Sequence, residues 1–174
     1  MLNLNLYKDF SVKAKCNKPK LAEEILLKNG AKFMGTDTQN DVYFKTAVGK
    51  LKLRQGHFEN ILIHYERAKA NTLMQTRVYV FQANPDKKKI TTLYDTREVI
   101  GKFKKERKIF FLDNVKIHLD KTDAGEFFIE IEAIDADGKF DTTYLQKQCE
   151  HYLQLLNVNN ADILADGYFK KVKR

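Results

Sequence analysis

Like-charged side chains at alternate positions are the feature of this sequence that could do chemistry. Lys and Arg alternate with Leu in "KLKLR" (50–54), and Lys105 and Arg107 stand in "KKERK", while Glu130 and Glu132 stand in "FFIEIE". Successive side chains of a strand point to opposite faces, so each set shares one face. Arg and Lys bind phosphate oxygens, and paired carboxylates suit a hard cation such as Mg²⁺ or Mn²⁺. Together they predict metal-assisted phosphoryl or nucleotidyl chemistry.

Three further stretches alternate polar and apolar residues in the same way. Their apolar positions, such as Phe10, Val12 and Ala14 in "KDFSVKAK" (8–15), would form the opposite strand face. The polar faces then hold Asp9, Ser11, Lys13 and Lys15 in that stretch, Tyr65 and Arg67 in "IHYER", and Lys116, His118 and Asp120 in "VKIHLD". For one strand alone, a polar face in water is an adequate explanation. For the whole set this explanation is insufficient, because clustered cations repel one another unless anions neutralise them. A shared interior that binds a polyphosphate would supply those anions.

The elements that would position these residues are short strands separated by turn-like residues. Strands are predicted at 8–15, 41–46, 50–56, 60–68, 76–83, 104–114, 115–122 and 126–134. Helices are predicted at 17–31, 91–103, 140–158 and 161–174, the first capped by Asn17 and stopped at Asn29-Gly30. The apolar strand faces must be buried against helices, and the charged faces are best placed around a common interior. The sequence therefore predicts an α+β fold: an antiparallel eight-stranded closed β-barrel with a polar lumen and helices packed outside.

Composition sets the class of protein and of partner. The 174 residues carry a formal net charge of +8, which favours an anionic partner, and they predict a single domain over 1–174. Cys16 and Cys149 are far apart and lack metal-type spacing, so a reduced, cytoplasmic setting is expected. No apolar run reaches the roughly 18 residues that span a bilayer, and no signal-peptide pattern opens the sequence, so no membrane partner is expected. Nucleic acid is not expected either, because no recognition motif is present.

In this order and spacing, the motifs resemble the CYTH family, also called triphosphate tunnel metalloenzymes, and most of all its class IV adenylate cyclase-type branch. The resemblance covers almost the whole chain. It is carried by "VKAKC", "KNGAKFMGTDTQNDVYF", "GKLKLRQG", "ILIHYERA", "KKERKIFFLDNVKIHLD" and "FFIEIEAI". It implies an eight-stranded antiparallel tunnel, a divalent ion (Mg²⁺ or Mn²⁺), and ATP or another triphosphate as partner. A homodimer is compatible with the sequence.

Carried over by position, the family motifs assign roles to most of the charged residues. Lys13 matches the lysine that closes an N-terminal Glu-x-Glu-x-Lys motif, and Lys116 takes the place of an arginine. The expected site residues are Lys13, Lys105 and Arg107 for catalysis; Lys15, Lys52, Arg54, Arg67, Lys116 and His118 for phosphate; and Glu130, Glu132 and Asp9 for metal. Asp41 also matches the family and could serve barrel packing instead, and whether Asp120 faces the lumen stays open.

The N-terminal motif departs from the family pattern. It reads Asp9-Phe10-Ser11-Val12-Lys13, so the first acid is one methylene shorter, about 1.5 Å, and the second is replaced by a hydroxyl. Ser11 is a weaker ligand for a hard dication than a carboxylate. Three functions therefore follow: an adenylate cyclase that converts ATP to cAMP and pyrophosphate, a triphosphatase acting on thiamine triphosphate or inorganic triphosphate, and a tunnel that binds a polyphosphate or nucleotide without turning it over.

Overall fold

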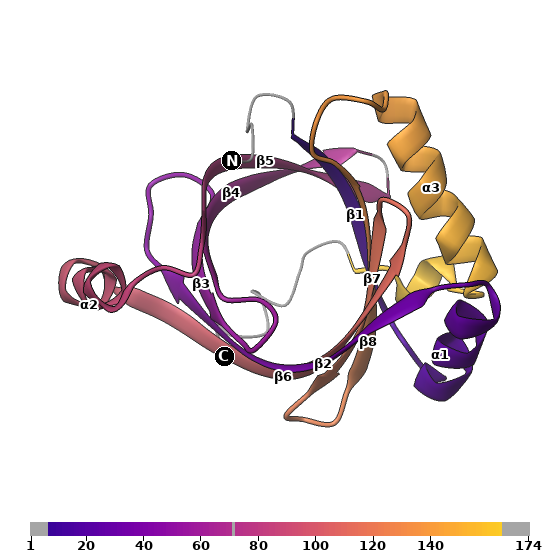
Figure 1. The fold of residues 1–174 in the computed structure, drawn as a ribbon, viewed down its shortest axis with the longest axis horizontal. Helices are drawn as coiled ribbons and strands as arrows, with labels where there is room; N and C mark the ends of the chain where they lie inside the picture. Colours follow the sequence, from indigo (N-terminus) through magenta and orange to yellow (C-terminus); the bar gives the residue numbers. More distant parts are fainter. Residues whose placement is uncertain (1–6, 71, 165–174) are drawn as a thin grey trace.

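The computed structural model describes residues 7–70 and 72–164. Within them the chain forms a closed barrel of antiparallel strands, seen end-on in Figure 1. The strands are β1 (Lys8–Lys15), β2 (Lys32–Phe44), β3 (Lys50–Gln55), β4 (Ile61–Ala70), β5 (Leu73–Ala83), β6 (Val99–Leu112), β7 (Val115–Thr122) and β8 (Phe127–Asp135). Around the barrel their order is β1-β5-β4-β3-β2-β6-β7-β8, and β8 pairs back with β1. The predicted α+β fold with an eight-stranded antiparallel barrel is confirmed.

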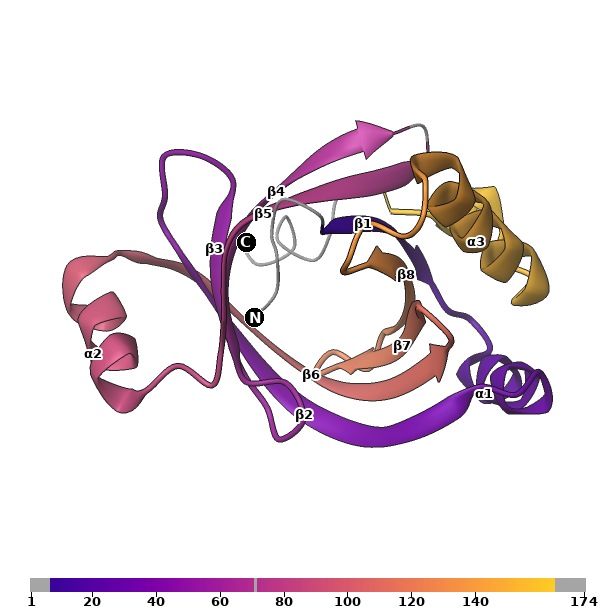
Figure 2. The same cartoon turned by 45° about the horizontal axis from the view of Figure 1, so that its top comes forward.

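Helices lie outside the barrel, as predicted. Figure 2 shows α1 (Pro19–Lys28) and α3 (Thr142–Leu155) on one side and α2 (Lys87–Thr96) on the other. Leu26 of α1 and Leu145 of α3 are fully buried in one core with the outward side chains of β1, β7 and β8. Leu93 of α2 packs with Leu53 and Leu62 in a smaller core. The apolar cores therefore lie between the barrel wall and the helices, which leaves the inward faces of the strands for polar residues.

Strand β1 closes the barrel unevenly. It pairs with β8 over its whole length but with β5 only from Asp9 to Ser11. Past that point the chain after α3 returns to β1: Leu164 N–H donates to the Lys13 carbonyl (2.8 Å), and Ile163 forms a bridge with Ala14. The free edge of β1 is thereby covered by this returning segment, which follows a short 3₁₀ helix, η1 (Asn160–Asp162).

Two of the helix predictions need correction. The helix expected at 91–103 is α2, which begins at Lys87 because Asp86 caps it by accepting from Lys89 N–H (2.7 Å). It ends at Thr96, and 99–103 belong to β6 because they pair with β2. Asn17 does not cap α1, since the N-cap is Lys18 and the Asn17 amide donates to Asp162. The Asp86 cap is a local signal that the prediction overlooked, whereas the β6–β2 pairing and the Asn17–Asp162 contact join residues far apart in the chain.

The remaining helix predictions fare differently. Helix α1 ends at Lys28, and Gly30 follows with a φ of +84°, as the Asn-Gly signal predicted. Asp141 caps α3 by accepting from Tyr144 N–H (2.7 Å). Of the helical piece expected at 161–174, only the part up to Leu164 is described, and the rest lies outside the described residues. In the described part of the chain, no helix is long and apolar enough to cross a membrane.

Candidate functional site

Charged side chains from most of the strands meet inside the barrel. Lys105 and Arg107 of β6 are each about 1% exposed, and Glu130 of β8 is 4% exposed. The structure brings together the expected site residues Asp9, Lys13, Lys52, Arg54, Arg67, Lys105, Arg107, Lys116, His118, Glu130 and Glu132. Lys15 is the exception. Its side chain is exposed at the last position of β1, away from the two cavities of the lumen, because the barrel wall ends there.

Two carboxylates of the wall hold the arginines in fixed orientations. Arg54 donates from Nε and Nη2 to Asp41 (2.7 and 2.8 Å), and Arg107 donates in the same way to Asp120 (both 2.6 Å). Lys105 Nζ also donates to Asp41 (2.7 Å). Burial alone would raise the pKa values of Asp41 and Asp120, but these cations hold both well below their usual range. The lumen thus supplies many of its own counter-ions, which the expectation of an anion-neutralised cation cluster did not foresee.

Glu59, a residue that the sequence did not mark, also reaches into the lumen. It lies in the loop between β3 and β4 and accepts from Arg54 Nη1 (2.8 Å), Gln39 Nε2 (2.7 Å) and Lys116 Nζ. Burial would raise the pKa of Glu59, but the neighbouring cations, Arg54 first, hold it well below its usual range. A loop carries no alternation, so nothing in the sequence pattern could have placed this carboxylate inside the barrel.

Lys52 lies in the lumen without a close counter-ion among the described residues. Its ammonium group lies 5.5 Å from the centroid of the Tyr65 ring, and no carboxylate of residues 7–70 or 72–164 is within ion-pair distance of it. Burial, together with the positive charge of Arg54, lowers the pKa of Lys52 to about 7. An anion brought beside Lys52 would favour its charged form, so this position is suited to a phosphate group.

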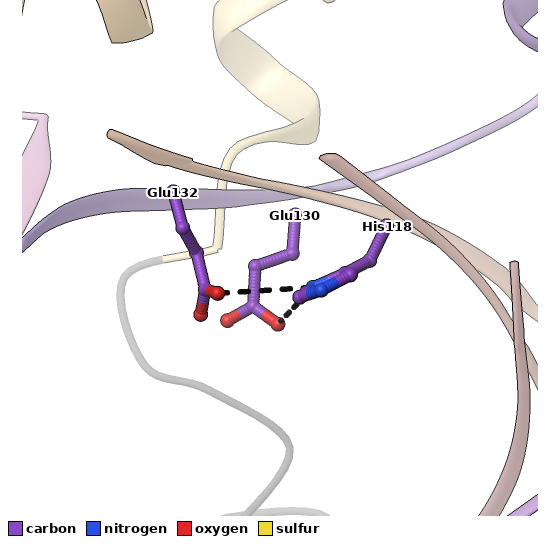
Figure 3. Close-up of side chains that lie close together, drawn as sticks. All are labelled: His118, Glu130 and Glu132. Atoms are coloured by element: carbon purple, nitrogen blue, oxygen red, sulfur yellow. Dashed lines mark ion pairs between the residues drawn. The ribbon is translucent and has the colours of Figure 1, made fainter. Parts of the chain in front are cut away.

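His118, Glu130 and Glu132 form a compact group of metal-ligand types (Figure 3). One ligand atom from each lies within 4.8 Å of the others, and His118 Nδ1 is 3.5 Å from Glu130 Oε2 and 4.0 Å from Glu132 Oε2. Neither ring nitrogen of His118 has a hydrogen-bond partner among the described residues. Burial and Arg107 lower the pKa of His118, so its imidazole is neutral and able to bind a metal. Two carboxylates and a neutral imidazole fit a divalent cation, so His118 lies with the expected metal ligands rather than with the phosphate-binding cations.

The N-terminal motif lies beside this group. Asp9 is 6% exposed, its Oδ1 has no hydrogen-bond partner within the described chain, and Tyr7 Oη donates to its Oδ2 (3.4 Å). Burial, and after it the charge of Glu132, raises the pKa of Asp9 to about 7, against the influence of Arg67. Ser11 is buried directly opposite Glu132 in the β1–β8 register. The position that a second N-terminal acid would take is thus next to a carboxylate of the metal-ligand group.

A cavity of about 520 Å³ opens from the charged wall, large enough for a small organic ligand. Lys52, Arg54, Arg67 and Lys116 line it. Apolar side chains also line it: Phe58, Ile61, Ile63, Val78, Phe81 and Ile134. A smaller cavity of about 50 Å³ lies among the cations and Glu130. Cations and apolar side chains line the larger cavity together, so it can contact both the phosphates and the organic group of one ligand.

Solved structures of similar fold come from several organisms. The PH1012 protein from Pyrococcus horikoshii OT3 is 21% identical, with 94% of this chain and 99% of that chain covered and a TM-score of 0.76. A "putative adenylate cyclase" from Vibrio parahaemolyticus is 18% identical, with 93% and 95% covered and a TM-score of 0.72. A "putative adenylyl cyclase" from Hippeastrum, described as having a dominant triphosphatase activity, is 14% identical, with 95% of both chains covered and a TM-score of 0.61. At these identities the likenesses show the fold alone.

The comparison with protein families gives a more specific result. No curated protein matches this chain. The family model of the CYTH domain matches residues 10–167, which include every described residue of the charged lumen except Tyr7 and Asp9. This match spans most of the chain and agrees with the closed barrel and its charged interior. The chain therefore belongs to the CYTH domain family.

Proposed function

We propose that this protein is a divalent-metal-dependent enzyme that acts on an organic triphosphate in the barrel lumen, and that it is an adenylate cyclase converting ATP to cAMP and pyrophosphate. CYTH family members generally process triphosphates with divalent metal ions, which supports the first part. The observation that favours an organic triphosphate is the 520 Å³ cavity, in which apolar side chains lie beside Lys52, Arg54 and Lys116. A bare inorganic triphosphate would leave those apolar side chains unused, whereas a nucleoside would contact them. The choice of a cyclase rests on the resemblance of the sequence motifs to the class IV adenylate cyclase-type branch.

The residues of the lumen have separate tasks in this proposal. Glu130, Glu132 and His118 would hold the metal ion, which would neutralise charge on the phosphate oxygens. Lys52 and Arg67 bind and orient the triphosphate, because their side chains line both cavities. Arg107 is held in place by Asp120 and keeps positive charge beside the metal ligands, where its Nη2 lies 2.9 Å from Glu130 Oε2. Charges fixed in advance in a buried site stabilise a pyrophosphate leaving group without having to reorganise.

A triphosphatase is the second candidate. The Hippeastrum structure, whose description gives a dominant triphosphatase activity, supports it for a chain of this fold. A binding protein without turnover is the third, and Ser11 supports it because the motif lacks one carboxylate beside Glu132. The two enzymatic candidates differ in which phosphorus the nucleophile attacks: the α-phosphorus for the ribose 3′-hydroxyl, or the terminal one for water.

Product analysis separates the three candidates. Purified protein with Mn²⁺ is incubated with ATP, inorganic triphosphate and thiamine triphosphate, and cAMP, pyrophosphate and orthophosphate are measured. We expect cAMP and pyrophosphate in equal amounts from ATP. Orthophosphate without cAMP would overturn the cyclase, and tight triphosphate binding without product under any metal would support the binding protein. Lys52→Met is expected to abolish turnover, and Lys45→Met, at an exposed position outside the barrel, is the matched control.

Triphosphate binding is expected to take up a proton at Lys52. At about pH 8 an amine with a pKa of about 7 is mostly neutral, and a phosphate beside it raises that pKa, so the amine binds a proton from solution. Calorimetric titration of inorganic triphosphate without metal, in buffers of different ionisation enthalpy, measures this uptake. We expect an uptake approaching one proton for the parent and a clearly smaller one for Lys52→Met. Equal uptake by both proteins would contradict the assignment.

Replacing Ser11 by Glu is expected to make stability depend more strongly on Mn²⁺. Ser11 pairs directly with Glu132, and like charges at such positions destabilise, here by about 1 kcal/mol when no metal is present. A divalent ion would join the two carboxylates, so the rise in melting temperature on adding Mn²⁺ should be larger than in the parent. Ser11→Gln, of similar size but uncharged, is the control. An equal Mn²⁺ effect in both variants would show that position 11 does not face the metal.

A further inference from the structure

Glu59 owes its place in the lumen to a loop whose backbone is held by a residue of strand β2. The loop spans 56–60, between β3 and β4. Asp37 of β2 is fully buried and accepts from the backbone N–H groups of His57 (2.6 Å) and Glu59 (3.2 Å). Gly56 lies so close to Asp37 that a Cβ there would be 2.5 Å from the carboxylate. The backbone of the loop is therefore fixed, and this fixed backbone directs the Glu59 side chain into the barrel.

The contacts of the Glu59 carboxylate are those that a phosphate group would make. Its Oε2 accepts from Arg54 Nη1 at 2.8 Å, its Oε1 pairs with Lys116, and Arg107 Nη1 lies 3.9 Å away. Charge-assisted donors of this kind bind carboxylate and phosphate oxygens alike. Glu59 thus occupies Arg54 and Lys116, two of the cations that the sequence predicted to bind phosphate.

Glu59 differs from the other counter-ions of the lumen in how it is attached. Asp41 and Asp120 project from strands, and each holds an arginine by two parallel hydrogen bonds, which fixes both partners. Glu59 projects from a loop on a longer side chain, and it lines the 520 Å³ cavity. Its side chain therefore has space into which it can turn while the backbone stays tied to Asp37.

We propose that Glu59 is a tethered competitor of the substrate: a phosphate group displaces its carboxylate from Arg54 and Lys116, and the side chain turns into the cavity. The inference rests on the proposed triphosphate site. Because every phosphate ligand that uses Arg54 and Lys116 must break these contacts, Glu59 weakens binding of substrate and of phosphate-bearing product. It thereby limits how long the cationic tunnel retains a polyphosphate.

Glu59→Gln tests the inference by ligand affinity. Inorganic triphosphate is titrated calorimetrically into the metal-free full chain, for the parent, Glu59→Gln and Glu66→Gln. Glu66 is exposed on the outer face of β4, where it accepts from Tyr79 Oη, so its replacement makes the same change in formal charge outside the lumen. We expect Glu59→Gln to bind about tenfold more tightly, the size expected when one charge-assisted contact no longer has to be broken, and Glu66→Gln to bind like the parent.

A second variant and a stability measurement make the outcomes distinguishable. Glu59→Ser is titrated in parallel, because a small side chain frees Arg54 and Lys116 without requiring an amide to fit between them, and melting temperatures establish which variants fold. Parent-like or weaker affinity in the folded Glu59 variants would overturn the inference while leaving the triphosphate site intact. Tightening in Glu66→Gln as large as in Glu59→Gln would also overturn it, since the effect would then be one of net charge. No binding by any protein, either without metal or in a repeat with Mn²⁺ present, would overturn the proposed function and the inference together.

Discussion

Replacing Arg107 by Met is expected to lower the free energy of unfolding by about 3–5 kcal/mol, the cost of breaking a buried ion pair from one side. Arg107 is 1% exposed and donates twice to Asp120 and once to Glu130. Met fills a similar length but leaves Asp120 without its strongest partner and Glu130 without one of its two closest cations, the other being Lys13. Urea denaturation followed by circular dichroism measures the difference.

Lys108→Met is the matched control, one residue further along β6. Lys108 points to the outer side of the barrel, where it pairs with Glu23 at a partly exposed position, so its loss should cost less than about 1 kcal/mol.

The pH dependence of stability provides a second check. Burial alone would raise the pKa of Asp120, but in the parent Arg107 first and then Lys13 and Lys105 hold it below its usual range. The stability that Asp120 contributes is then present above its unfolded pKa and is lost as pH falls. Without Arg107 much of that contribution is absent at neutral pH. The difference in free energy of unfolding between the parent and Arg107→Met should therefore shrink as pH falls. Equal losses of stability in Arg107→Met and Lys108→Met would contradict the role given to Arg107.

The barrel itself could be predicted because the alternation of polar and apolar residues marks each strand and also shows which of its faces points inward. In β1, the alternation of Phe10 and Val12 with Ser11 and Lys13 fixes both the strand and its inward face, and the predicted bounds match the structure. The other charged strands repeat this pattern, and their polar faces can satisfy one another only in a closed barrel. The sequence thus predicted the fold because the charged faces of several strands, taken together, require a shared interior.

The pairing between charged residues was harder to predict, because it depends on strand register, and register can be predicted only where the connection between two strands is short. Arg107 lies directly opposite Asp120 because β6 and β7 join through a two-residue turn, Asp113-Asn114, with Asp113 at a φ of +51°. A turn this short fixes the register, so this pair could have been found by counting outward from it. Arg54 lies opposite Asp41 across a longer connection, 45–49, whose length does not determine the register.

The least predictable part of the site comes from residues outside the strand pattern. Glu59 belongs to a loop, and its position depends on Asp37, twenty-two residues earlier in the chain. His118 could be placed in the lumen from its strand, but its approach to Glu130 depends on the β7–β8 register, in which the two are directly paired. Such groupings arise from tertiary structure, which is why the sequence indicated the chemical types present and not which of them meet.

Replacing Glu132 by Gln is expected to lower Mn²⁺-dependent turnover by at least about 100-fold, since even residues that only orient metal ligands typically contribute 10–100-fold. Glu132 is a better test than Glu130, because Glu130 also pairs with Lys13 and Arg107 and its loss would disturb the wall. The one cation that pairs with Glu132 in the described chain is Arg67, at 3.8 Å, apart from the His118 imidazole. Gln keeps the shape and removes the charge, so the melting temperature should change little.

The Glu132→Gln experiment measures metal binding as well as turnover. Calorimetric titration of Mn²⁺ should show affinity lowered by a comparable factor, and high Mn²⁺ should restore part of the lost turnover, because a weakened site can still be filled by mass action. Glu150→Gln, at an exposed position on α3, is the control for loss of one carboxylate and should leave both quantities unchanged. Unchanged Mn²⁺ affinity in Glu132→Gln would remove this carboxylate from the metal site. The remaining candidates would then be Glu130 and His118 with the buried Asp9, whose Oδ1 has no hydrogen-bond partner within residues 7–70 and 72–164.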